Sequence, residues 1–370
     1  MGDSTLDLGT VSGIQTYLSN TPFASDHITI LSGGYSNFAY RIKLILPYDG
    51  RTTLVVKHSK SYVLAAGQKL PFDTIRQFFE VEALTRVKDV PSSKQLVTVP
   101  TVHRFDKQAN VIIIDDCGED ALTLKKFMQD GRSNPSLSEE IGRALGEFIG
   151  NMHMWGRQNR PVLDLFETNE QGKTISAWAT YGRLESTLTG KDDLPVLQDP
   201  PIDVSREQLE IIKTLSSERT LDMTSAREWF VMGDFWPGNI LITLDNAGAL
   251  KRIYILDWEV AKTGLPELDL GQFCAEMDLL RRFHPECAES AGKTISTFLG
   301  TYSELCRPDI SFARRAITHW GVHLVAWVPR IPWGSKEDTR KTVEEGVSLL
   351  VEGYTGSDEW VKSSFVKDLC

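Results

Sequence analysis

The stretch that most constrains this chain spans residues 229–269. Apolar residues lead to Gly233-Asp234, and two short runs rich in β-branched and apolar residues follow at 240–243 and 252–256. An Asn-Ala-Gly tripeptide between these runs is typical of a turn. We therefore predict a strand that leads into Asp234 and a β-hairpin after it.

Three oxygen-bearing side chains, Asp234, Asn239 and Asp257, lie at one end of this predicted hairpin. Asp234 and Asn239 have the D-x-x-x-x-N spacing of a kinase catalytic loop. Kinases use one Asp to orient the attacking hydroxyl and accept its proton, and an Asn and a second Asp to hold magnesium. Magnesium prefers oxygen ligands of this kind. The alternative is a hairpin with ordinary turn carboxylates.

The motifs around these residues resemble those of the aminoglycoside phosphotransferase and choline kinase group, the small-molecule relatives of protein kinases. That group has a catalytic loop of the form H-G-D-x-x-x-x-N and a second motif D-x-[DE], which is D-W-E here and begins at Asp257. A later G-L-P and Asp269 are also similar to the group. The resemblance implies that Asp234 is the catalytic residue and that Asn239 and Asp257 are metal ligands.

One position departs from this resemblance. Met232 stands two residues before Asp234, where the group usually has His. Methionine cannot donate the hydrogen bonds with which an imidazole braces a loop, so the departure puts the precision of the loop in doubt. The alternative function is a catalytically impaired kinase-like protein that binds nucleotide or regulates. A protein kinase is disfavoured, because the sequence has neither an A-P-E nor a D-F-G motif.

The N-terminal part has a glycine-containing loop between two predicted strands, 28–31 and 39–46. Glycines allow backbone N–H groups to approach a phosphate closely. The loop is similar to the S-G-G-x-x-N nucleotide loop of the group, and the alternative is an ordinary hairpin loop. The resemblance implies that the nucleotide contacts Ser32, Gly33, Gly34 and Asn37.

Lys57 ends the next predicted strand, 52–56, and His58 and Lys60 are expected to lie outside it and to be exposed. In the kinase template, a Lys on the third strand contacts the nucleotide phosphates and pairs with a Glu on the following helix. The order of the motifs therefore favours a nucleotide-binding role for Lys57 over a solvated side chain.

The helix that carries the partner carboxylate is predicted at residues 73–88, with Asp73 as its N-cap. Glu80 has apolar residues three, four and seven positions later, whereas Glu82 has Arg86 four positions later on an exposed face. We therefore assign the ion pair with Lys57 to Glu80. A pair between Glu80 and the preceding Arg76 is the alternative.

Residues 91–100 are predicted to be a linker, and 102–105 and 111–114 to be strands. The periodicity then changes from strand to helix near Leu122. In the kinase arrangement this change is the hinge between the lobes, whose backbone groups read the adenine edge; the alternative is a domain boundary with no ligand. The resemblance places Asp115, Asp116 and Cys117 beside the nucleotide.

Most of the remaining sequence has helical periodicity. Residues 160–201 are expected to be irregular and to line the acceptor site, because the group varies there. His153 is expected to be a core or interface residue without a catalytic role. His319 and His323 have the i, i+4 spacing of metal ligands, but no carboxylate accompanies them at a suitable spacing, so packing is favoured.

Composition excludes several classes of protein. The net charge of −10 argues against non-specific nucleic-acid binding. No apolar run approaches the roughly 18 residues of a membrane helix. The five cysteines are scattered and include no C-x-x-C pair, so neither a zinc site nor a disulfide framework is indicated and a reducing cytosol is expected.

The resemblance implies an α+β, bilobal protein-kinase-like fold. Residues 1–117 would form a nucleotide-binding N-terminal lobe with a small antiparallel sheet, and residues 118–370 a mainly helical C-terminal lobe with the catalytic loop and the acceptor site. ATP and Mg²⁺ are the implied cofactors. The implied partner is a small-molecule hydroxyl acceptor, such as an amino sugar or an amino alcohol, and no nucleic acid or membrane. The sequence sets no oligomeric state.

Overall fold

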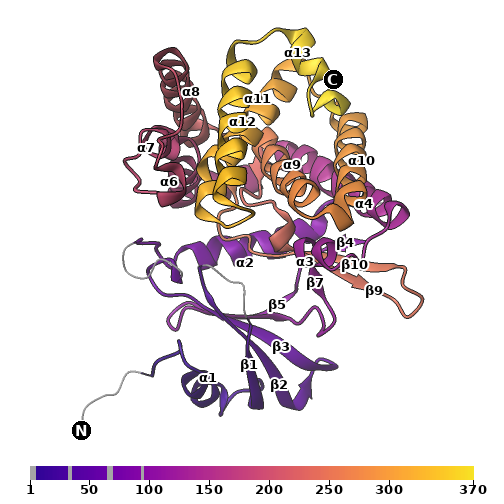
Figure 1. Cartoon of the computed structure of the whole chain (residues 1–370). Helices are drawn as coiled ribbons and strands as arrows, with labels where there is room; N and C mark the ends of the chain where they lie inside the picture. Colours follow the sequence, from indigo (N-terminus) through magenta and orange to yellow (C-terminus); the bar gives the residue numbers. More distant parts are fainter. Residues whose placement is uncertain (1–5, 32–35, 65–69, 93–95) are drawn as a thin grey trace. The chain divides into compact units, whose positions relative to one another are not determined.

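The computed structural model of the chain describes residues 6–31, 36–64, 70–92 and 96–370. The chain divides into two compact units, Met1–Lys88 with Val99–Ala121 and Asp89–Thr98 with Leu122–Cys370. The first is built on an antiparallel sheet and the second is mainly helical (Figure 1). This composition confirms the predicted α+β class.

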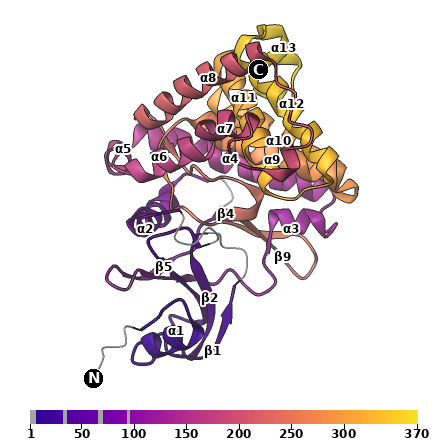
Figure 2. The ribbon, with the colours of Figure 1, turned by 60° about the vertical axis from the view of Figure 1, so that its left-hand side comes forward.

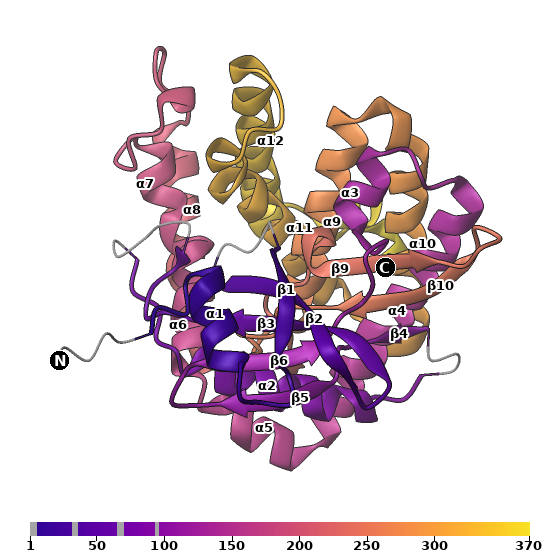
Figure 3. The ribbon, with the colours of Figure 1, turned by 90° about the horizontal axis from the view of Figure 1, so that it is seen from below.

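The described part of the first unit contains a five-stranded sheet in the order β1-β2-β3-β6-β5, in which all neighbours are antiparallel (Figure 3). Three consecutive residues of β6, Val111, Ile112 and Ile113, have no exposed surface, so both faces of this strand are covered. The strands are β1 (Ser25–Ile30), β2 (Phe38–Tyr48), β3 (Arg51–His58), β5 (Val102–Asp106) and β6 (Val111–Asp115).

Two α-helices lie in the described part of the first unit. Helix α1 (Val11–Leu18) begins where the Thr10 side chain accepts a hydrogen bond from Gly13 N, and it packs its buried apolar residues against the sheet. Helix α2 (Arg76–Arg86) starts later than predicted, because the Asp73 carboxylate accepts from Ile75 N at 2.8 Å and closes a separate turn before the helix.

The prediction that His58 lies outside its strand and is exposed was wrong. His58 is the last residue of β3, pairs with Phe38 of β2 and Val111 of β6, and is 7% exposed. Its Nδ1 lies 3.1 Å from the carbonyl oxygens of Ala109 and Asn110. Strand β3 continues to His58 because β2 and β6 both extend far enough to pair with this residue. The short apolar run in the sequence did not reveal this pairing.

The second unit is organised around α9, which packs against α10 and α11 and buries residues around nearly its whole circumference (Figure 2). No described helix is both long enough and apolar enough to span a bilayer. The α-helices are α3 (Leu124–Gln129), α4 (Pro135–Gln158), α5 (Arg160–Glu167), α6 (Glu170–Ala179), α7 (Leu184–Leu188), α8 (Arg206–Ser225), α9 (Pro266–Phe283), α10 (Ala288–Cys306), α11 (Ile310–Ala326), α12 (Lys336–Thr355) and α13 (Asp358–Ser363).

The expectation that residues 160–201 are irregular was wrong, because this region contains α5, α6 and α7. Each of the first two begins at an asparagine: the Asn159 side chain accepts from Val162 N, and the Asn169 side chain accepts from Gly172 N. These helices are too short for their periodicity to stand out in the sequence. Helices α6 and α7 form a group with α8 beside α11 and α12 (Figure 1), whereas α5 packs against α4, β8 and β11.

Two small sheets hold the loops of the second unit. They are β4 (Val97–Thr98), β10 (Leu250–Ile255), β9 (Ile240–Leu244) and β7 (Leu122–Thr123), in that order, and the pair β8 (Phe230–Val231) and β11 (Lys262–Thr263). β4 pairs with β10 in parallel, so the predicted linker at 91–100 contains a short strand. β9 and β10 form the predicted hairpin.

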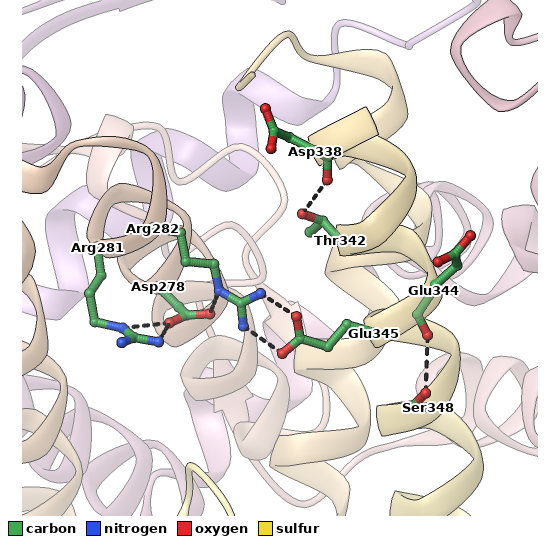
Figure 4. A network of polar contacts seen from close by, with 8 residues as sticks. All are labelled: Asp278, Arg281, Arg282, Asp338, Thr342, Glu344, Glu345 and Ser348. Carbon is green, nitrogen blue, oxygen red and sulfur yellow. Dashed lines mark hydrogen bonds and ion pairs between the residues drawn. The ribbon is translucent and has the colours of Figure 1, made fainter. Parts of the chain in front are cut away.

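The C-terminal end of α9 is fixed to α12 by an ion-pair network (Figure 4). The Asp278 carboxylate accepts from Arg281 and Arg282, and Arg282 also donates to Glu345 of α12 at 2.8 Å. Within α12, the Thr342 and Ser348 hydroxyls donate to backbone carbonyls one turn earlier. This network keeps the last turn of α9 in a fixed position.

Candidate active site

The loop after β8 has a backbone that only glycine fits at residue 233. Gly233 has a φ of +79°, and a Cβ there would come within 2.1 Å of the Lys262 ammonium. Strand β8 is paired with β11, which places Lys262 opposite Val231. The pairing therefore sets the direction in which the chain leaves the strand at Asp234.

The Asp234 carboxylate is held by two neutral amides. Asn239 Nδ2 donates to Asp234 Oδ2 at 2.9 Å and to the Asp234 carbonyl at 3.0 Å. Gln272 Nε2, on α9, donates to Asp234 Oδ1 at 2.8 Å. Both carboxylate oxygens are thus oriented by donors that carry no charge.

Burial raises the pKa of Asp234 to about 6, against the opposing hydrogen bonds from Gln272 and Asn239. The nearby carboxylates of Asp257 and Glu259 raise it further. A carboxylate with a raised pKa is better suited to general-base catalysis near neutral pH, because its pKa lies closer to the working pH.

Asp257 follows β10 and adopts a left-handed φ of +59°, which is uncommon for a residue other than glycine. Just before it, Leu256 N donates to the Asn239 carbonyl at 2.8 Å. The predicted metal ligands Asn239 and Asp257 are therefore joined through the backbone. A carboxamide oxygen and a carboxylate are donors that fit a hard cation such as Mg²⁺.

The predicted catalytic loop is braced from α9 in a way that Met232 does not disturb. Met232 is fully buried, and its backbone N–H donates to Asp269 Oδ2 at 3.0 Å, while Gly233 N donates to Asp269 Oδ1 at 2.8 Å. His153, which has no exposed surface, lies 3.2 Å from the same Asp269 carboxylate. The loop thus has a bracing carboxylate although residue 232 is not His.

A small hollow of about 30 Å³ lies beside this loop within the second unit, lined by Gly233, Lys262 and Gln272 and by residues of α6, α8, α9 and α11. Lys262 donates to the Ser176 hydroxyl at 2.9 Å and to the Val260 carbonyl at 3.1 Å, and burial lowers its pKa to about 8. His319 lines the same hollow; its pKa is lowered to about 3, chiefly by burial. Its burial agrees with the predicted packing role.

In the first unit, the Lys57 ammonium forms an ion pair with Glu80, as predicted. Both side chains are buried, whereas Glu82 and Arg86 form a partly exposed pair at 2.8 Å on the other side of α2. Arg76, the alternative partner, donates to a set of backbone carbonyls and to Asn37.

Of the predicted nucleotide loop, Ser32, Gly33 and Gly34 lie outside the described residues, and Asn37 lies within them. Asn37 is 7% exposed, and its Oδ1 accepts from Ser59 at 2.5 Å and from Arg76 at 3.1 Å. Its carboxamide therefore anchors the start of β2 against α2.

The predicted hinge residues have side chains engaged in ion pairs. Asp115 accepts from Arg51 at 2.5 Å, and Asp116 accepts from Arg41 at 2.7 Å. Burial opposes ionisation of Asp115, but hydrogen bonds from His103, Thr101 and Arg51 outweigh it and lower its pKa to about 2. Burial raises the pKa of the Cys117 thiol to about 12. These side chains stabilise the local fold.

Gln272 is the site residue that the sequence did not reveal. Its role depends on α9 lying against the catalytic loop, which is a contact between residues 38 positions apart. The one sequence signal for Gln272 was its position three residues after Asp269 on the same helix.

A sequence model described as the phosphotransferase enzyme family matches residues 27–300. The chain belongs to this family. It is 30% identical to the 4-hydroxytryptamine kinase of Psilocybe cyanescens over 94% of each chain, and 26% identical to a methylthioribose kinase of Bacillus cereus over 74% of this chain and 67% of that one. This membership confirms the resemblance predicted from the catalytic-loop motifs.

The fold is also that of known kinases. A choline/ethanolamine kinase family protein from Mesorhizobium loti superposes with a TM-score of 0.50 at 13% identity, covering 95% of this chain and 99% of that one. This similarity confirms the protein-kinase-like fold.

Proposed function

We propose that this phosphotransferase moves the γ-phosphoryl group of ATP, with Mg²⁺, to a hydroxyl of a small molecule. The observation that carries the proposal is the Asp234 carboxylate, which Asn239 and Gln272 orient from both sides. In this role Asp234 orients the acceptor hydroxyl and takes its proton as the phosphoryl group arrives.

Asn239 and Asp257 would hold the metal, because they offer a carboxamide oxygen and a carboxylate on backbone segments that are tied together. When bound, Mg²⁺ neutralises charge on the nucleotide phosphates. Lys57 would contact those phosphates, with Glu80 holding its ammonium in position. Rate would come chiefly from positioning and from charge stabilisation.

The relatives support a small-molecule acceptor, because their names specify 4-hydroxytryptamine and methylthioribose. The alternative, a kinase-like binder that transfers nothing, rested on Met232. The backbone N–H groups of residues 232 and 233 donate hydrogen bonds to the Asp269 carboxylate. These hydrogen bonds support an ordered loop and therefore an enzyme.

A two-part experiment tests the proposal. Thermal denaturation with saturating ATP and Mg²⁺ should show a rise in stability that a chelator removes; at about 100 times the dissociation constant the gain is roughly 2.7 kcal/mol. A screen of amino alcohols, amino sugars, sugars and hydroxyindoles, read out by ADP release, should then identify an acceptor. The absence of any nucleoside triphosphate binding would contradict both the enzyme and the binder.

A further inference from the structure

The guanidinium of Arg183, in the second unit, contacts two indole rings. Arg183 is the last residue of a short 3₁₀ helix, Tyr181–Arg183, that follows α6. Its Cζ lies 4.0 Å from the centroid of the Trp178 ring on α6 and 5.3 Å from that of the Trp327 ring at the end of α11. These contacts join the group of α6, α7 and α8 to α11 (Figure 1). We call Arg183, Trp178 and Trp327 the arginine cluster.

The hydrogen-bond donors of Arg183 are unused within the part of the chain that the structure describes. No described oxygen accepts from its guanidinium, and no described carboxylate forms an ion pair with it. The nearby Asp192 carboxylate is engaged elsewhere, because it forms an ion pair with Arg330 and accepts from the Thr187 hydroxyl at 3.0 Å. Arginine presents five N–H donors in a planar fork, so Arg183 has the capacity to bind a further group.

The surroundings of Arg183 disfavour its positive charge. Burial lowers the pKa of the guanidinium to about 10, and the charge of Arg330 lowers it further, against a smaller opposing effect of Asp192. A carboxylate partner would shift the pKa in the other direction. An oxyanion that arrives at Arg183 therefore gains charge-assisted hydrogen bonds without displacing a resident carboxylate.

The arginine cluster is fixed by neighbouring elements. Tyr181, at the start of the same 3₁₀ helix, is 2% exposed, and its carbonyl accepts from the Ser216 hydroxyl of α8 at 2.6 Å. The Trp327 ring stacks on His323, one turn earlier along α11, with 6.4 Å between the ring centroids. The segments that carry the cluster are therefore ordered before any ligand binds, which lowers the entropic cost of binding.

The cluster is open to a ligand. Trp178 is 43% exposed, and Arg183 and Trp327 are partly exposed. A guanidinium binds the paired oxygens of a carboxylate or a phosphate. An exposed indole beside it offers a face on which a planar apolar group can stack. Together these features specify a small aromatic molecule that carries an oxyanion.

The cluster is separate from the proposed catalytic residues. His319 of α11 lines the hollow beside Gly233. Trp327 follows His319 by eight residues, which is about 12 Å along a helix that rises 1.5 Å per residue. We therefore expect substitutions in the arginine cluster to leave Asp234 and its hydrogen bonds in place.

We propose that Arg183, together with Trp178 and Trp327, binds the carboxylate or phosphate of a small aromatic molecule. The inference goes beyond the proposed function and does not depend on it, because the cluster contains none of the residues proposed to act on the acceptor, the nucleotide or the metal. The site can therefore be tested without any nucleotide.

The test compares benzoate with benzamide, in which a neutral amide replaces the carboxylate in a molecule of nearly the same shape. Binding of each to the full chain is measured by ligand-observed NMR titration. Benzoate should bind more tightly than benzamide. Arg183→Gln should weaken benzoate binding about tenfold or more, the effect of losing hydrogen bonds to a charged group, and leave benzamide nearly unchanged.

Phenyl phosphate distinguishes the two kinds of oxyanion. It should also bind to the wild type and lose affinity in Arg183→Gln, because the guanidinium accepts either group as a partner. The tighter of benzoate and phenyl phosphate then identifies the oxyanion that the site prefers.

Three further variants separate the contributions of the cluster. Arg183→Lys keeps the charge but loses the planar fork, so its affinity for benzoate should lie between those of the wild type and Arg183→Gln. Trp178→Ala should weaken benzoate about 2- to 10-fold and leave acetate, which has no ring, nearly unchanged. Arg157→Gln is the matched control, because the exposed Arg157 of α4 also stacks on an indole, that of Trp229 at 4.7 Å. Melting temperatures show which variants are folded.

Two results would overturn the inference: equal affinity of the wild type for benzoate and benzamide, or equal losses of benzoate affinity in Arg183→Gln and Arg157→Gln. The first comparison needs only the wild type, so it decides the matter even where a variant fails to fold. If benzoate binding depends on Arg183 but the wild type binds no nucleoside triphosphate, the oxyanion site stands and the proposed phosphoryl transfer fails.

Discussion

Lys57 in the first unit and Lys262 in the second unit are both buried, but in different surroundings. Lys57 is 6% exposed and forms an ion pair with the buried Glu80. Lys262 is 3% exposed, and the partners that accept from it are the neutral oxygens of Ser176 and Val260. In the part of the chain that the structure describes, no carboxylate forms an ion pair with Lys262.

Asp115 and Asp116 of the first unit differ from Asp234 of the second unit in a similar way. Asp115 and Asp116 in the first unit are neutralised by arginines, whereas Asp234 in the second unit is held by the amides of Asn239 and Gln272. A charge that is neutralised inside the protein contributes mainly to stability. A charge held by neutral donors remains available to a substrate, so we expect its loss to affect turnover more than stability.

The largest expected effect is on turnover in the second unit. Asp234→Asn keeps the shape of the side chain and removes the general base, so turnover should fall by about 10²–10⁴ with little change in melting temperature. Single-turnover rates with the acceptor from the screen provide the measurement. Asp245→Asn, in the exposed hairpin turn, is the control and should keep wild-type turnover. Wild-type turnover in Asp234→Asn would show that the catalytic loop is wrongly assigned.

The next largest effect is on the stability of the first unit. Glu80→Gln leaves the Lys57 ammonium buried opposite a neutral amide, so the free energy of unfolding should fall by about 3–5 kcal/mol. Chemical denaturation measures this loss. Glu82→Gln, on the same helix but in a partly exposed pair, should cost only about 0.2–1 kcal/mol. Equal losses in the two variants would contradict the expectation that the buried Lys57–Glu80 pair contributes more to stability than a partly exposed pair.

The smallest effect is a pH dependence of stability from Lys262. Its pKa is about 8 in the folded chain, below the usual lysine value of 10.5, so between these values the unfolded chain binds more protons. Stability should therefore rise with pH across this window in the wild type, and the Lys262→Met variant should lose that part of the slope. Denaturation at several pH values from 7.5 to 10.5 tests this; identical slopes would contradict the unpaired state of Lys262.

Local sequence patterns predicted the features that depend on residues close together in the chain. The β9–β10 hairpin, the Asp234–Asn239 contact and the Glu80 assignment each follow from spacing within one element or loop. The errors occurred where distant residues decide the outcome. His58 is buried because two other strands pair with it, and β4 exists because β10 lies beside it.

The same distinction explains the site residues that were missed or misjudged. Met232 cast doubt on the loop, because it stands where the group usually has His. The bracing carboxylate of Asp269 accepts from the backbone N–H groups of residues 232 and 233, so it places no requirement on the side chain at 232. Gln272 could not be assigned without knowing that α9 packs beneath the loop. Side chains that act on backbone or across elements leave little signal in a single sequence.

The most direct test of the central claim compares ATP binding by Asp234→Asn and Asp257→Asn, with Mg²⁺ and with a chelator, by calorimetry on the same preparations. If Asp234 acts on the acceptor and Asp257 holds the metal, Asp234→Asn should bind ATP·Mg²⁺ nearly as the wild type does, and Asp257→Asn should lose most of the Mg²⁺-dependent affinity. Equal affinity in Asp257→Asn and the wild type, or a loss confined to Asp234→Asn, would contradict this division of roles.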